Sequence, residues 1–214
     1  VNGGTFTAFD SVFTGNRGWR GGAVAARNNA IITMSGTNVT RNNATRDVNS
    51  GGWAVTGGGG GFYLFSSTLS LHLSRISFNS AGNTQYPSHN GYGGGIFAFG
   101  DIACTFSASS IHHNDAVYGG GIFLDTDNIV FFFQIDLSHN KARYSGGGIY
   151  LYTATIHVSN SSINGNIGGS QGAGIYAYSY SRHNILLSNV VVSTNKLITE
   201  GQNYEGGGGV YLDH

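Results

Sequence analysis

Hydrophobic and polar residues alternate along much of this chain with a period of two. At 149–152 (IYLY) and 175–178 (IYAY), isoleucine, leucine or alanine alternates with tyrosine. Such alternation is typical of β-strands, in which successive side chains point to opposite faces, and it does not fit the 3.6-residue period of a helix. Glu, Lys and Gln are scarce, while β-branched and aromatic residues are abundant. The pattern therefore predicts a chain of short β-strands.

The strand pattern recurs as an internal repeat with two anchors. The first anchor is an apolar residue after a pair of glycines: Val24, Phe62, Ile96, Ile122, Ile149, Ile175 and Val210. The second is an asparagine three residues after an apolar residue: Asn16, Asn42, Asn79, Asn114, Asn140, Asn166 and Asn195. The segment between the two apolar residues hardly varies, whereas extra residues gather at about 43–57, 80–92 and 196–206. A constant coil with loops inserted at one corner is typical of a solenoid.

A coil of about 26 residues accommodates three short strands joined by tight turns. We therefore predict an all-β, single-stranded parallel β-helix of about six to seven coils, forming one domain over 1–214. The general crossover preference favours a right-handed helix. Glycines would turn one corner, and the asparagines would stack as a hydrogen-bonded ladder. Both ends fall within a coil, so we expect part of a longer chain or a unit of a stacked assembly.

The glycine and asparagine motifs resemble those of a known family. They are similar to the paired GGA[I/V/L] and FxxN motifs of the polymorphic outer membrane protein repeats known from chlamydiae, and the resemblance covers nearly the whole chain. The residues that carry it are GGAV at 21–24, GGGI at 93–96, 119–122 and 146–149, and Phe78-Asn79. The resemblance implies a β-helical surface adhesin. The chain departs from the family in having a single cysteine, where such proteins often carry several.

Two aromatic columns are expected on one outer face. If the glycine-linked anchors point inward, the second and fourth residues of each strand point outward. We predict an interaction face made of Tyr63, Phe65, Phe97, Phe99, Phe123, Tyr150, Tyr152, Tyr176, Tyr178 and Tyr211. Its partner would be another copy, a neighbouring repeat or domain, a host or cell-surface protein, or a glycan stacked on the rings. The alternative is that the aromatics only stabilise the sheet or lie beneath an inserted loop.

Composition narrows the function. Charged residues make up 9% of the chain, the net charge is zero, and there is no basic block, which excludes nucleic acid as an expected partner. No apolar run is long enough for a membrane helix. Sequons at Asn38, Asn43 and Asn160 predict glycosylation and fit an extracellular or cell-surface location.

Acidic residues give the best candidate for chemistry. Asp101 and Asp127 share a column in adjacent coils, and Asp125 lies two residues from Asp127. Three carboxylates on one β-helix face are similar to the calcium site of pectate lyases. Such an enzyme also needs a basic residue over the cleft, and Arg27 and Arg182 lie coils away. We favour a structural or cation-binding role, with Ca²⁺ as the one candidate ion and no other cofactor.

Other reactive residues are interpreted as structural. His113 and His139 each precede an asparagine of the ladder in adjacent coils, so their side chains should lie about 5 Å apart. A metal site would need Asp115 as a third ligand. We prefer the interpretation that the two histidines are a surface pair without a metal. Asp115 and Lys141 should form an ion pair between coils. Cys104 is expected in the core.

Two further motifs are set aside. The glycine runs at 57–61 and 206–209 lack the GK[ST] of phosphate loops, and Thr5 and Thr7 are an isolated pair rather than a regular Thr-x-Thr array.

The leading hypothesis is a non-enzymatic, structural or adhesive extracellular β-helix that assembles end to end or laterally into a filament or surface layer. The alternatives are a pectate-lyase-like polysaccharide enzyme and a glycan-binding module.

Overall fold

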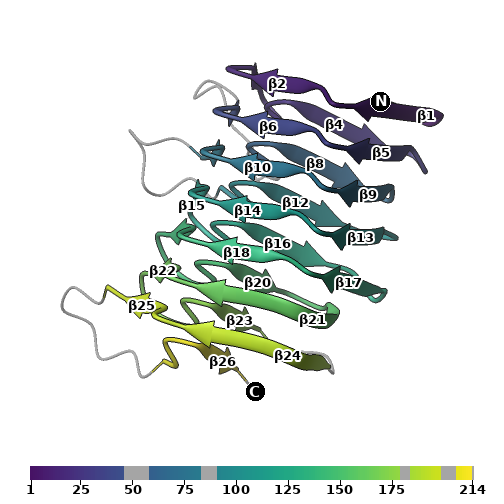
Figure 1. Cartoon of the computed structure of the whole chain (residues 1–214). Helices are drawn as coiled ribbons and strands as arrows, with labels where there is room; N and C mark the ends of the chain where they lie inside the picture. The colour runs from purple at the N-terminus through teal and green to yellow at the C-terminus, as the bar shows by residue number, and fades with distance from the viewer. Residues whose placement is uncertain (46–57, 83–90, 179–183, 199–205, 214) are drawn as a thin grey trace.

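The chain forms a parallel β-helix (Figure 1). The computed structural model describes residues 1–45, 58–82, 91–178, 184–198 and 206–213. Every strand pairing among them is parallel and joins one coil to the next, as in Thr5↔Ile31 and Ile96↔Ile122. Among the described residues there is no helix with the length and apolarity needed to cross a membrane. The predicted fold class is confirmed.

Three sheets run along the β-helix. Sheet 1 holds the strands that follow the glycines: β4 (Val24–Arg27), β8 (Phe62–Phe65), β12 (Ile96–Phe99), β16 (Ile122–Asp125), β20 (Ile149–Leu151), β23 (Ile175–Ala177) and β26 (Val210–Leu212). Sheet 3 holds the two-residue strands that follow the asparagines: β3 (Arg17–Gly18), β7 (Asn43–Ala44), β11 (Ser80–Ala81), β15 (Asp115–Ala116), β19 (Lys141–Ala142), β22 (Ile167–Gly168) and β25 (Lys196–Leu197).

Sheet 2 has two limbs. The first limb contains β1 (Thr5–Phe9), β5 (Ile31–Ser35), β9 (Thr68–His72), β13 (Ala103–Ser107) and β17 (Ile129–Phe133). The second contains β2 (Val12–Thr14), β6 (Asn38–Thr40), β10 (Arg75–Ser77), β14 (Ser110–His112) and β18 (Asp136–Ser138). The long strands β21 (Thr155–Asn164) and β24 (Ile185–Ser193) run through both limbs and join them into one sheet.

The core lies between the sheets and is built from columns of equivalent residues. The glycine-linked anchors align in register along sheet 1, as predicted, and their side chains are buried up to Ile175. Leu64, Leu124 and Leu151 occupy the third position of their strands and are also fully buried. In the last strands, Val210 and Leu212 continue these columns but are exposed. Alternation along each strand therefore decides which side chains fill the core.

The glycine triplets turn the corner between sheet 3 and sheet 1. Gly119 has a φ of +63°, which few other residues adopt. A Cβ on Gly120 would overlap the backbone of Lys141. The extra residues predicted at this corner separate β7 from β8, β11 from β12 and β25 from β26, and most of them lie outside the described residues.

The asparagines form the predicted ladder. The backbone N–H and the Nδ2 of Asn114 both donate to Oδ1 of Asn140, each at 3.0 Å. Nδ2 of Asn114 also donates to the carbonyl oxygen of Ile76, at 3.0 Å. The same pattern links Asn16 to Asn195 through all seven members. The ladder satisfies polar groups that the turn between sheets 2 and 3 would otherwise bury unpaired.

Candidate functional site

The aromatic residues at the second position of the sheet 1 strands form a column outside the core, on the outer side of the sheet. Its rings align in register from strand to strand and form a cluster separate from the core. The side chains point outward, as predicted, but most of the rings are buried, which the sequence did not indicate. The buried members are Tyr63, Phe97, Phe123, Tyr150 and Tyr176, while Tyr211 is half-buried.

The rings are buried because they pack on one another along the helix axis. The ring centroids of Phe123 and Tyr150 lie 4.8 Å apart with an angle of 10° between the planes, and those of Tyr150 and Tyr176 are also 4.8 Å apart. From the side, Tyr92 packs on Phe123 at 4.8 Å and Tyr118 packs on Tyr150 at 5.6 Å. These contacts between coils therefore stabilise sheet 1 along this column.

Sequence reasoning missed the tyrosines on this flank. Tyr92, Tyr118 and Tyr144 follow one another across three coils, with ring centroids 5.6 Å and 5.3 Å apart. A signal was available, because each of these tyrosines stands one or two residues before a glycine triplet (GYGGG, VYGGG, RYSGGG). The outer side of sheet 1 therefore carries three aromatic columns, one more than predicted, and we call these three columns the aromatic band.

The fourth position of the sheet 1 strands gives an outer column that is partly exposed. Phe65 is 38% exposed and Tyr152 is 39% exposed. The rings of Phe65 and Phe99 pack at a tilt of 33° with centroids 4.7 Å apart, and Tyr152 stacks on Tyr178 at 5.4 Å. Asp125 stands between these two pairs in the same column, since it is in register with Phe99. A carboxylate thus interrupts a column that is otherwise aromatic in these coils.

An aromatic cleft opens at this interruption. Its volume is about 500 Å³. It is lined by Tyr92, Phe97, Phe99, Tyr118, Phe123, Asp125, Tyr150, Tyr152 and Tyr178. We call this set the aromatic cleft. It joins all three aromatic columns, and its size is in the range of small-molecule sites, roughly 300–1,000 Å³.

Asp125 is held in place by its neighbour in the next coil. The hydroxyl of Thr153 donates to Oδ1 of Asp125 at 2.8 Å. The other two aspartates of the predicted trio lie elsewhere: Asp101 is exposed and accepts a hydrogen bond from Nδ2 of Asn128 at 2.7 Å, and Asp127 is exposed. Within the described part of the chain, no three acidic, histidine or cysteine side chains gather in a way that could hold a metal ion. The trio therefore does not form the calcium site considered from the sequence.

Burial changes the acidity of the tyrosines in the cleft. It raises the pKa of the Tyr118 and Tyr150 phenols, and the neighbouring tyrosines raise these pKa values further. Outside the cleft lining, burial also raises the pKa of Tyr176, whose hydroxyl donates to Oδ2 of Asp213 at 3.0 Å. These phenols therefore keep their protons at physiological pH and are able to act as hydrogen-bond donors.

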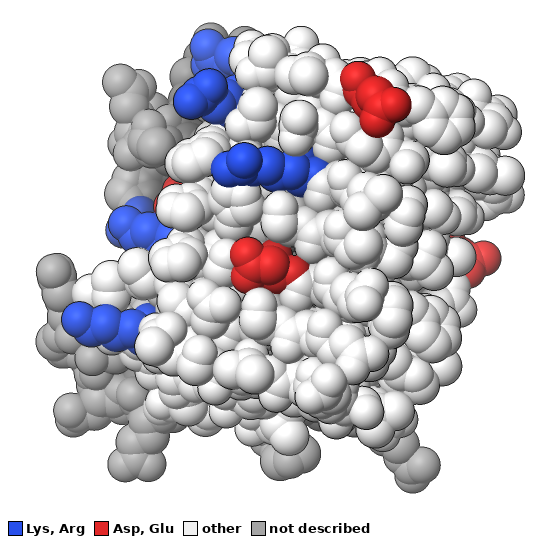
Figure 2. Space-filling view, in the orientation of Figure 1, with Lys and Arg blue, Asp and Glu red and all other residues white. Residues whose placement is uncertain are grey.

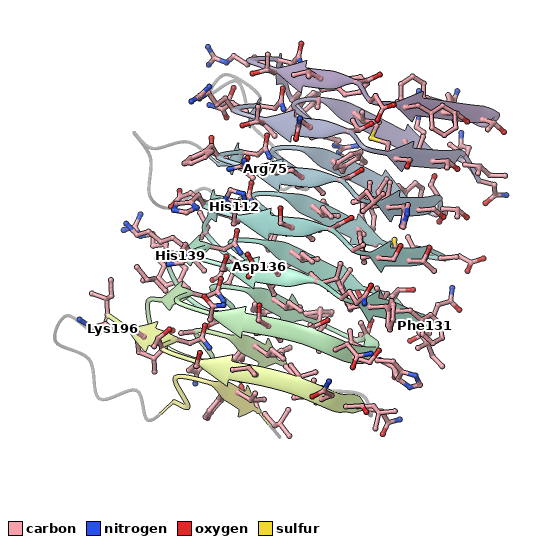
Figure 3. The ribbon with its side chains drawn as sticks, in the orientation of Figure 1. Arg75, His112, Phe131, Asp136, His139 and Lys196 are labelled. Carbon is pink, nitrogen blue, oxygen red and sulfur yellow. The ribbon has the colours of Figure 1, made fainter. Side chains whose placement is uncertain are left out.

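Two stacked histidines lie at the turn between sheets 2 and 3, and one of them, His139, is labelled in Figure 3. The rings of His113 and His139 are stacked with centroids 5.1 Å apart, which confirms the predicted spacing. Phe78 extends the stack, with its centroid 4.9 Å from that of His113. The sequence did not indicate that Nδ1 of His112 lies 2.9 Å from Nδ1 of His113. Phe78, His113 and His139 all have a positive φ, near +55°, so the turn itself aligns them.

Few charges lie on the face of sheet 2 shown in Figure 2, and basic side chains follow one edge. Arg17, Lys141 and Lys196 belong to one column of sheet 3. Asp115 is adjacent to Lys141 in register. Asp115 is exposed at the surface, and partial desolvation by its neighbours raises the pKa of its carboxyl, while the charge of Lys141 lowers it. The two residues are neighbours in register, and the ion pair between them stays a prediction.

The predicted core cysteine and the three sequon asparagines differ in how far they are buried. Cys104 is a core residue, as predicted, and burial raises the pKa of its thiol to about 12. Asn38 and Asn160 are exposed, as a glycosylated asparagine must be. Asn43 is only partly exposed, and its Oδ1 is buried without a hydrogen-bond partner, so this sequon is the least accessible of the three.

Thr5 and Thr7 are not repeated as a Thr-x-Thr pair in the next coils, as expected, but Thr7 begins a column of hydroxyl side chains. In register along the first limb of sheet 2, it is followed by Thr33, Ser70 and Thr105. Phe131 ends this column of hydroxyls in the next coil. The column spans four coils and is too short and mixed to be a regular Thr-x-Thr array.

Comparisons with known proteins returned no match to any family model, to any curated protein or to any solved structure. The resemblance to the polymorphic outer membrane protein repeats therefore stays a resemblance of short motifs. Function has to be argued from the aromatic cleft itself.

Proposed function

We propose that this chain is a non-enzymatic adhesive β-helix that binds a glycan in the aromatic cleft. The observation that carries the proposal is the cleft of about 500 Å³, lined by eight aromatic side chains and one carboxylate. An extracellular or cell-surface location is part of the proposal, because glycans are displayed there and two exposed sequons fit it. The resemblance of the repeats to surface adhesins points in the same direction.

The chemistry of the cleft suits a sugar. Sugar rings have an apolar C–H face that packs on aromatic rings and a rim of hydroxyls that needs hydrogen-bond partners. Five of the lining residues are tyrosines, which offer both an apolar body and a polar tip. Asp125, held by Thr153, adds a strong acceptor for sugar hydroxyls. The residues that line the cleft also belong to four successive coils, from Phe99 to Tyr178, so it offers room for more than one sugar unit.

The other predicted functions have less support. A polysaccharide lyase would need a basic residue at the reacting centre, and the described residues that line the cleft include none. Assembly into a filament or layer stays a prediction, and so does contact with another copy through the aromatic face. Both are compatible with glycan binding, because an adhesin acts at a surface where several copies meet.

Two exposed rings of one column provide the test. Tyr152 lines the cleft, whereas Phe65 has nearly the same exposure in the same column but does not line it. We expect Tyr152→Ala to weaken binding of a glycan identified on a glycan array by roughly five- to tenfold, as the loss of one aromatic contact implies. Phe65→Ala should leave it unchanged. Isothermal titration calorimetry measures the affinities, and circular dichroism checks the fold. A wild-type chain that retains no glycan, or equal losses in both variants, would refute the proposal.

A further inference from the structure

One position of the outer aromatic column carries a negative charge where its neighbours carry rings. Asp125 lies in register with Phe99 of the preceding coil. Its strand, β16, is in turn paired in register with β20 of the following coil. Asp125 is the single charged side chain among the described residues that line the cleft. Its carboxylate is partly exposed and accepts a hydrogen bond from the Thr153 hydroxyl, which orients it without neutralising it.

The same aromatic band already binds cations within the chain. The guanidinium of Arg20 lies 5.4 Å from the ring centroid of Tyr63, in the buried column. The guanidinium of Arg143 lies 5.6 Å from the ring centroid of Tyr144, in the flanking column. Both distances are within the range of cation–π interactions. Two rings of the aromatic columns, both outside the cleft lining, therefore already have a positive group over their faces.

The aromatic cleft combines many rings with one negative charge. Its lining combines eight aromatic side chains with one carboxylate and includes no Lys or Arg among the described residues. Aromatic rings around a carboxylate form an environment that attracts an ammonium group, through the ring faces and through the opposite charge. The same environment is unfavourable for an anion, because a buried charge needs a partner of opposite sign.

We propose that the cleft selects glycans that contain an amino sugar with a free, protonated amine, and that Asp125 binds the ammonium group. This inference rests on the proposed glycan-binding function and adds the charge of the ligand to it. The sugar rings pack on the tyrosines and phenylalanines, and the ammonium group lies at the interruption of the column between Phe99 and Tyr152. A uronate-containing glycan is excluded by the same carboxylate.

A matched pair of oligosaccharides tests the inference. Glucosamine hexamer and N-acetylglucosamine hexamer share one backbone and differ in the free amine. At a pH where the amine is protonated, we expect the wild-type chain to bind the glucosamine hexamer at least tenfold more tightly. Asp125→Asn keeps the size of the side chain and an acceptor for Thr153, so it should fold normally and lose this preference while still binding the N-acetylated hexamer. Asp101→Asn, which changes an exposed carboxylate outside the cleft, is the control and should keep the preference.

The outcomes separate the two proposals. If neither hexamer nor any other glycan binds, glycan binding itself is wrong. If glycans bind but both hexamers bind equally, or if Asp125→Asn keeps the preference, the selection of amino sugars is wrong. Choline and Nα-acetyl-lysine amide serve as cations without a sugar. If either binds as tightly as the glucosamine hexamer, the site recognises the ammonium group alone and the assignment to amino sugars is overturned.

Discussion

His112 lies in a cluster of titratable and charged groups on the outer surface of sheet 2 (Figure 3). Burial lowers the pKa of His112 to about 4, and the charges of Arg75 and His113 lower it further than Asp136 raises it. Arg75 and Asp136 are on the strands before and after that of His112. His112 is therefore neutral in the folded chain at pH values where a histidine of the unfolded chain, with a pKa near 6.5, takes up a proton.

This shift predicts a loss of stability as the pH falls. Between pH 7 and pH 5 the unfolded chain binds a proton at His112 and the folded chain does not, so the free energy of unfolding decreases. One proton corresponds to at most about 1.4 kcal/mol per pH unit, and solvent screening of this half-exposed ring makes the contribution smaller. We expect His112→Asn to flatten the pH dependence of urea unfolding in this range. His72→Asn, at an exposed position of the other limb, is the control.

Identical slopes for the wild type and His112→Asn would contradict this prediction. The range ends at pH 5 because Asp115 acts in the opposite direction at lower pH. Partial desolvation raises the pKa of Asp115, so the folded chain takes up that proton before the unfolded chain does, and this gain stabilises the fold as the pH falls.

At the scale of elements, the asparagine ladder decides whether the turn between sheets 2 and 3 is stable. Asn114 is buried, and its Oδ1 accepts from the backbone N–H and from Nδ2 of Asn79, each at 3.0 Å. Its own Nδ2 donates to Ile76 and Asn140. Asn16, at the first rung, is exposed and uses its side chain only to donate to Asn42.

Asn114→Ala should therefore destabilise the chain far more than Asn16→Ala. The first substitution leaves several buried polar groups without partners, each costing about 1–3 kcal/mol, so we expect a loss of about 3–5 kcal/mol. The second removes one exposed contact and should cost about 1 kcal/mol or less. Urea unfolding measures both variants. Similar losses in the two would show that the buried rungs do not stabilise the turn.

The residue pattern within a coil predicted the strands and the ladder, but it did not predict which side chains of neighbouring coils meet. The alternation in 149–152 identified the inward and outward side chains, and the spacing of the anchors identified the ladder, because both depend on residues that repeat in every coil. The burial of Tyr150 was not predicted, since it results from Tyr118 of the preceding coil packing on it from the side. Nor was the position of Asp125 beside Thr153 evident, because the two side chains meet only when coils stack.

At the scale of the whole molecule, the β-helix is a stack in which each coil contacts its neighbours. Ile96 and Ile122 are equivalent, and each follows a glycine triplet. Deleting 96–121 joins Gly95 to Ile122 and removes one complete coil. In a solenoid, stability is roughly the sum of coils and their interfaces.

We therefore expect the 96–121 deletion to give a soluble β-sheet protein of lower stability. The loss should be about 1–2 kcal/mol if a typical domain stability of 5–15 kcal/mol is shared among the coils. Glycan binding should be lost, because Phe97, Phe99 and Tyr118 of the cleft are removed. Deleting 96–108 instead removes half a coil and should prevent folding. Circular dichroism and urea unfolding distinguish these results, and an unfolded 96–121 variant would contradict the modular view.

The sequence by itself determined the β-helix, the corner glycines, the ladder and the direction in which each side chain of a strand points. These follow from period-two alternation, from backbone conformations open to glycine, and from the hydrogen-bonding capacity of asparagine, all of which act within a coil or identically in every coil. Only the tertiary structure decided which outward rings are buried, where the aromatic cleft opens and what charge lies in it. These depend on side chains of different coils, which become neighbours only after the chain has stacked.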